Sequence, residues 1–95
     1  MGRPIKPRQC SCPNREEHEA IFKPAGIPLH ELEKTNLFMD ELEALHLCDS
    51  EGMTQEQAGS CMGISRGTVQ RLLSEGRRKI VTALVKKGAV VISAR

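Results

Sequence analysis

Apolar residues recur at helical spacing in two long stretches of the chain. In the first, at about residues 37 to 49, the apolar positions are Phe38, Leu42, Leu45 and Cys48. Intervals of three and four residues place such positions on one face of a helix. The pattern predicts an amphipathic helix that ends near Gly52, because glycine readily adopts the left-handed conformation that terminates many helices.

The second stretch predicts a longer helix that begins after Ser65. Its apolar positions form one continuous stripe and are Val69, Leu72, Leu73, Gly76, Ile80, Ala83 and Leu84. We expect the whole stripe to be buried. Lys87 and Gly88 follow the last apolar position and are expected to end the helix.

A third, short helix is predicted between these two by its capping signals. Thr54 and Gln57 form a capping box, in which each side chain satisfies a free backbone amide of the first helical turn. The helix can continue only to about Met62, because Gly63 follows it. Ser65 then provides the N-cap of the long helix, so a tight turn joins the two helices.

Small residues stand where a helix-turn-helix at about residues 54 to 73 requires them. Ala58 and Gly59 lie in the middle of its first helix, where the second helix must cross closely, and Gly63 lies at the turn. The residues expected to face DNA at the start of the second helix are Ser65, Arg66, Gly67, Thr68, Gln70 and Arg71. The alternative is an ordinary helical hairpin with a polar face.

These residues suggest how the helix would bind a duplex. We expect it to enter the major groove with Arg66, Gln70 and Arg71 nearest the bases, and with Thr68 and the free amides of the first turn on phosphate. Arg77 and Arg78 lie too far along the helix to share the base pairs of Arg66. They either contact phosphate or keep the helix soluble.

Composition and charge fit one small DNA-binding domain. The chain has 95 residues, no Trp or Tyr, and a formal net charge of +2. Residues 25 to 62 carry eight acidic residues against Lys34, whereas residues 63 to 95 carry eight Lys or Arg against Glu75. Such polarisation favours a basic face turned to a polyanion; solvated surface charges are the alternative. No nucleophile with a paired base is visible, so we expect no enzyme.

The two ends of the chain are expected to meet in a small sheet. Residues 89 to 92 are rich in β-branched residues, and residues 20 to 23 form a comparable apolar segment. We predict a two-stranded pairing of residues near 21 to 23 with residues near 90 to 92, within one chain or exchanged in a homodimer. Either arrangement would bury Phe22 against the helices.

Residues 1 to 19 are interpreted as a flexible basic arm, and residues 20 to 95 as the single folded domain. The arm either enters a neighbouring minor groove or stays idle. Cys10 and Cys12, with His18 nearby, are weak candidates as ligands of zinc or an iron-sulfur cluster; otherwise we expect no cofactor. Cys48 and Cys61 are expected to be buried. No apolar run could cross a membrane, so the expected location is the cytoplasm.

Two resemblances extend this interpretation. Residues 37 to 84 resemble region 4 of bacterial sigma factors, chiefly in the stretches EALHL, EGMTQEQAG and GISRGTV. The whole chain, from its opening GRP through FKPAGIPL and DELEAL, is similar to the domain-of-unknown-function 134 family of small predicted DNA-binding proteins of prokaryotes. Nothing in the chain matches the promoter-melting region, so it does not resemble a complete sigma factor.

The resemblances imply a mainly α fold, a region-4-like bundle of about four helices, and a regulatory role. Taken with the residue patterns, they favour a transcriptional regulator that binds double-stranded DNA. Two alternatives stay open: a module that contacts RNA polymerase without reading DNA, and a metal- or redox-responsive regulator.

Overall fold

The structure is a computed structural model that describes residues 20 to 95. The predicted arm, with Cys10, Cys12 and His18, lies outside the described residues. The elements in chain order are strand β1 (Ala20–Phe22), a 3-10 turn η1 (Leu29–Glu31), strand β2 (Lys34–Phe38), helix α1 (Met39–Leu45), a π-helical segment η2 (His46–Ser50), helix α2 (Gln55–Met62), helix α3 (Arg66–Lys86) and strand β3 (Ala89–Ser93).

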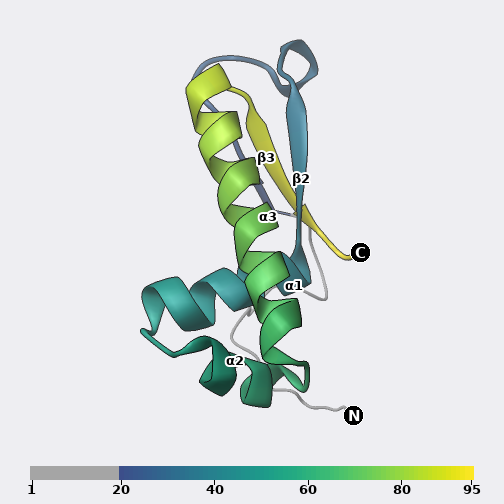
Figure 1. Cartoon of the computed structure of the whole chain (residues 1–95). Helices are drawn as coiled ribbons and strands as arrows, with labels where there is room; N and C mark the ends of the chain where they lie inside the picture. The colour runs from purple at the N-terminus through teal and green to yellow at the C-terminus, as the bar shows by residue number, and fades with distance from the viewer. Residues whose placement is uncertain (1–19) are drawn as a thin grey trace.

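Helix α3 is the long axis of the molecule. Figure 1 shows α1 and α2 around its N-terminal half and the strands alongside its C-terminal half. The largest fully buried side chains come from the sheet and from α3. They are Leu37 of β2 and Leu73 and Val69 of α3. The helix ends where the sequence indicated, because Lys87 adopts a left-handed conformation with φ of 55°.

The predicted pairing of the two ends is confirmed within one chain. Strand β1 pairs with β3 in antiparallel orientation, with Phe22 opposite Val90 and Ala20 opposite Ile92. The sheet is nevertheless larger than expected. Among residues 20 to 95 it has three strands in the order β1-β3-β2, and β3 is central because β2 pairs with its other edge in parallel orientation.

Strand β2 includes residues that the sequence pattern assigned to the first amphipathic helix. Leu37 and Phe38 are extended, and α1 begins at Met39. Leu37 is only 2% exposed, so it contributes to the core as a residue of the strand and not as a residue of the helix. Residues 20 to 95 thus form three α-helices with two short helical segments, and the expected count of about four helices is not confirmed.

Two apolar side chains at the sheet end of α3 are less buried than predicted. Leu84 is 70% exposed, whereas its neighbour Ala83 is 3% exposed. The narrow sheet covers only one side of the last turns of α3. The apolar stripe continues around the helix beyond this side, so Leu84 is not covered by the sheet. Phe22 is 62% exposed for a related reason: it belongs to an edge strand of three residues. The prediction that Phe22 is buried against the helices is therefore wrong.

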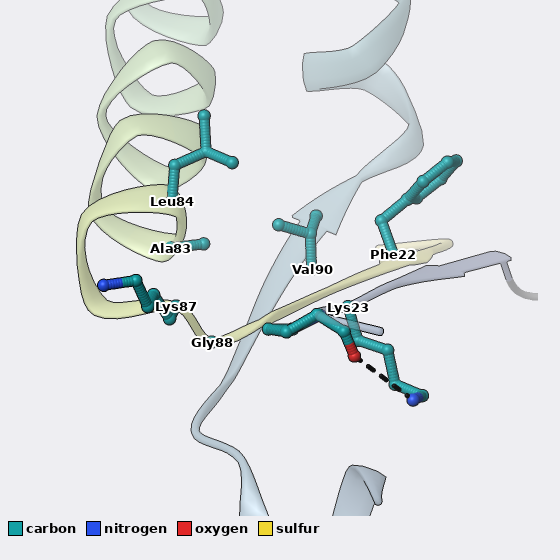
Figure 2. Close-up of a pocket in the computed structure, with 8 residues that line it drawn as sticks. Phe22, Lys23, Ala83, Leu84, Lys87, Gly88 and Val90 are labelled. Atoms are coloured by element: carbon teal, nitrogen blue, oxygen red, sulfur yellow. Dashed lines mark hydrogen bonds between the residues drawn. The ribbon is translucent and has the colours of Figure 1, made fainter. Parts of the chain in front are cut away.

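Phe22 and Leu84 instead border a shallow pocket of about 320 Å³ between β1, β3 and the end of α3 (Figure 2). Val90 and the aliphatic part of Lys87 also line it. The ammonium group of Lys23 takes part in the adjoining turn, where it donates a 2.8 Å hydrogen bond to the carbonyl of Ile27. The lining is mainly apolar and offers no paired acid and base.

Within residues 20 to 95, no helix is both long enough and apolar enough to cross a membrane.

Candidate nucleic-acid interface

The unit formed by α2, a tight turn and α3 begins with the predicted capping box. The hydroxyl of Thr54 accepts a 3.1 Å hydrogen bond from the amide of Gln57, and the Thr54 amide donates to Gln57 Oε1 at 2.9 Å. Helix α2 ends at Gly63, which has φ of 75°. Ser65 is the N-cap of α3, and its Oγ accepts a 3.1 Å hydrogen bond from the amide of Thr68. The caps and the turn are thus confirmed.

The two helices cross as closely as the small residues indicated. A Cβ atom on Gly59 would lie 2.7 Å from the carbonyl oxygen of Ile64 and 3.6 Å from Cγ2 of Val69. Ala58 and Val69 are both fully buried at this crossing. Only a residue without a side chain leaves room for the turn to fold back over α2 in this way.

The first two turns of α3 present a polar, partly basic face. Arg66, Gly67, Gln70 and Arg71 are exposed there, and Thr68 is half-buried. Within the described part of the chain, neither Arg66 nor Arg71 has an ion-pair partner. A Cβ atom on Gly67 would meet nothing within 4 Å. The start of α3 therefore combines unpaired positive charge with an open backbone surface.

Arg77 and Arg78, the other two predicted contact residues, are in a different situation. Arg77 donates two hydrogen bonds to the Asp49 carboxylate, at 2.7 and 3.1 Å, and lowers the pKa of Asp49 chiefly through these bonds. Arg78 donates to Glu75 at 2.7 Å. Along the helix axis, Arg77 lies about 16 Å from Arg66. The structure does not bring these two arginines to the exposed start of α3.

These ion pairs change the interpretation of the charge polarisation. Within the described chain, five of the eight basic residues at positions 63 to 95 contact carboxylates: Arg77 with Asp49, Arg78 with Glu75, Lys79 with Glu41, Lys86 with Glu33 and Arg95 with Asp40. Four of these pairs join the basic second half to the acidic first half, and the pair of Arg78 with Glu75 lies within the second half. Among residues 63 to 95, the basic residues without such a pair are Arg66, Arg71 and Lys87.

One polar contact at the α3 face was missed from the sequence. Gln55, the first residue of α2, donates a 2.5 Å hydrogen bond from Nε2 to Oε1 of Gln70. Gln70 in turn donates to the hydroxyl of Ser74 at 3.3 Å. The two glutamines are 15 residues apart, and only the crossing angle of the helices brings them together. No spacing rule in the sequence indicates this pair.

The cysteine predictions are only partly correct. Cys48 is half-buried, and burial together with the charge of Asp49 raises the pKa of its thiol. Cys61 is exposed, so the expectation that it is buried is wrong. It lies on the outer side of α2, where its Sγ is 4.0 Å from Sδ of Met53. Residues 20 to 95 contain no group of three or more His, Cys, Asp or Glu side chains that could hold a metal ion.

The fold defines a small, mainly helical protein in which two helices joined by a tight turn present an exposed face. The chain belongs to the family described as "Protein of unknown function DUF134", which matches residues 1 to 94. No solved structure matches it.

Curated relatives of the family are similar over nearly the whole chain. A UPF0251 protein of Vibrio parahaemolyticus is 44% identical over 92 residues, which cover 96% of this chain and 92% of the relative. A UPF0251 protein of Desulforudis audaxviator is 47% identical over 96 residues, but these cover 95% of this chain and only 57% of that longer relative. The chain thus spans little more than half of the Desulforudis protein.

Proposed function

We propose that the protein is a transcriptional regulator that binds double-stranded DNA in a sequence-specific manner, and that α2 and α3 form its helix-turn-helix. The observation that carries the proposal is the start of α3. Exposed, unpaired Arg66 and Arg71 stand there beside Gln70 and the open surface at Gly67. This is the end of a recognition helix that contacts base edges when such a helix lies in the major groove.

The chemistry of these side chains suits the proposal. Arginine bonds bidentately to the O6 and N7 atoms of guanine, and glutamine to the N6 and N7 atoms of adenine. In the proposed complex Arg66, Gln70 and Arg71 face the bases. Ser65, Thr68 and the amides of the first turn lie near phosphate, where the positive end of the helix dipole favours negative charge. Gly67 lets the backbone approach the duplex.

The ion pairs narrow the set of contact residues. Arg77 could reach phosphate only by giving up its two hydrogen bonds to Asp49, and Arg78 only by leaving Glu75. Exposed pairs of this kind are weak, so both arginines remain available for secondary contacts. In the proposed complex both arginines contact the phosphate backbone at the edge of the interface and take no part in base readout.

The stiff attachment of α3 to the rest of the fold also supports this role. Gly76 packs so closely on α1 that a Cβ atom there would lie 2.8 Å from Cδ1 of Leu45. Lys79 of α3 also donates a hydrogen bond to the buried carboxylate of Glu41, which belongs to α1. A recognition helix held by a rigid scaffold keeps its side chains in register with the base pairs.

Selection from a pool of random duplexes with the purified chain tests the proposal. We expect enrichment of a common sequence, and affinity for that sequence well above the affinity for unrelated DNA at the same salt concentration. Binding of all duplexes with equal affinity would contradict sequence-specific readout. If no duplex is bound while purified RNA polymerase retains the protein, the polymerase-contacting module replaces the proposal.

A further inference from the structure

We propose that Gln55 is a specificity-determining residue, which fixes the amide of Gln70 and thereby sets the base that α3 prefers at one position of its site. This inference rests on the proposed DNA-binding function. It adds a residue from α2 to a readout that otherwise belongs to α3 alone.

The first argument is the direction of the hydrogen bond between the two side chains. Gln55 donates from Nε2 to Oε1 of Gln70 at 2.5 Å. A carbonyl oxygen has two lone pairs, so Oε1 of Gln70 can still accept a second hydrogen bond. Its own Nε2 bonds to the Ser74 hydroxyl at 3.3 Å, a longer contact that another acceptor can replace. Gln70 thus keeps one acceptor and one donor for a ligand.

This combination matches adenine. In the major groove adenine presents an N6 donor and an N7 acceptor, the complement of an oriented carboxamide. A free glutamine must lose the rotational freedom of its side chain when it binds. Because Gln55 already restricts the Gln70 amide in the free protein, less rotational freedom is lost when DNA binds. The expected preference at the Gln70 position is therefore an A·T pair.

A second observation concerns the other end of the Gln55 amide. Its Oε1 atom is buried and has no hydrogen-bond partner among residues 20 to 95. A buried polar atom without a partner is unfavourable, so a group with no other role at this position would be expected to turn toward solvent. The pairing with Gln70 accounts for the orientation in which Gln55 is held.

The experiment is a double-mutant cycle on the DNA preference of the full chain. Gln55→Met retains the length of the side chain and removes its hydrogen bonds. Gln70→Met does the same at the residue proposed to contact the base. The preferred duplex of the wild-type protein is compared with duplexes changed at single base pairs, for both variants and for the double variant. Circular dichroism and thermal melting confirm that each variant is folded, with Gln55→Ala as a second variant.

We expect Gln70→Met to lose roughly 5- to 100-fold of discrimination at one A·T pair. Gln55→Met should lose about 2- to 10-fold at the same pair, the size expected for an unrestrained side chain. The double variant should resemble Gln70→Met, because Gln55 acts only through Gln70. Ser74→Ala is the matched control and should change discrimination less than Gln55→Met.

Three results would overturn the inference while leaving the proposed function intact. They are full discrimination in both folded Gln55 variants, a loss at a base pair that Gln70 does not read, and a double variant in which the two losses add. Failure of the wild-type protein to select any sequence would instead overturn the proposed function and this inference together.

Discussion

Lys79 and Glu41 form a largely buried ion pair between α3 and α1. The ammonium Nζ lies 2.8 Å from Oε1 and 3.1 Å from Oε2 of the carboxylate, whose side chain is only 3% exposed. The same carboxylate accepts a 3.0 Å hydrogen bond from the amide of Phe38, and the Phe38 ring lies 4.3 Å from the ammonium. One pair therefore connects the start of α1, the end of β2 and the middle of α3.

We predict that Lys79→Met lowers the free energy of unfolding by up to about 3 kcal/mol, because it leaves the buried Glu41 carboxylate with Arg95 alone as a counter-charge, and the Nη2 of Arg95 lies 3.7 Å from Oε2. Arg78→Met is the control. Its pair with Glu75 lies on the surface, where solvent screens the charges, so its loss should change stability far less than the loss of Lys79. Urea denaturation measures both variants. Equal losses would show that the Lys79 pair contributes no more than a surface contact.

Gly59→Ala should destabilise the fold by about 1 to 3 kcal/mol. The added methyl group would lie 2.7 Å from the carbonyl oxygen of Ile64, which belongs to the backbone of the turn and cannot rotate away. Thermal melting of the variant and the wild-type chain checks this prediction. An unchanged melting temperature would mean that the turn does not pack on α2 as the structure describes.

Gly67→Ala is the counterpart on the outer face of the unit. The new methyl group meets nothing within 4 Å, and alanine favours helix more than glycine, so stability should rise by about 0.5 kcal/mol. Affinity for duplex DNA should fall, because the methyl group would stand between α3 and the duplex. A variant that is more stable and binds DNA as tightly as the wild-type chain would remove Gly67 from the interface.

The pair of Asp49 with Arg77 predicts a small pH dependence. Hydrogen bonds from Arg77 lower the pKa of Asp49 in the folded state. A lowered pKa stabilises the fold above the unfolded value of about 4, and this contribution is lost as the pH falls through the folded value. Because both side chains are about half exposed, the effect should stay below about 1 kcal/mol.

Asp49→Asn isolates this contribution. The variant should be less stable than the wild-type chain at pH 7, and the difference should shrink as the pH falls below 4. Urea denaturation at both pH values provides the comparison. A difference that stays constant with pH would show that Asp49 stabilises the fold by its shape rather than by its charge.

The parts of the fold that local signals determine were predictable from the sequence. Thr54, Gly63 and Ser65 act through backbone groups of their own turns, so their roles follow from residue type and spacing alone. The pairing of β1 with β3 was predictable for a different reason. Each segment is apolar, and each needs a partner for its backbone groups.

Other features depend on contacts between distant segments and could not be read from periodicity. Leu37 and Phe38 fall within the stretch for which helical spacing predicted a helix but belong to β2, whose partner β3 lies far along the chain. The exposure of Leu84 depends on how far the sheet covers α3. At the candidate interface, the sequence indicated which arginines are near the start of α3. It could not indicate that Arg77 is engaged by Asp49, or that Gln55 meets Gln70.

The central claim is that the start of α3 binds duplex DNA, and the salt dependence of binding by two matched variants tests it most directly. Arg71→Gln and Lys87→Gln each remove one positive charge that has no ion-pair partner among residues 20 to 95, but Lys87 directly follows the last residue of α3, about 24 Å further along the helix axis. For a selected duplex in fluorescence anisotropy, the account predicts weaker binding and a smaller slope of affinity against salt for Arg71→Gln, with Lys87→Gln close to the wild-type chain. Equal effects of the two substitutions, or wild-type affinity in a folded Arg71→Gln variant, would contradict it.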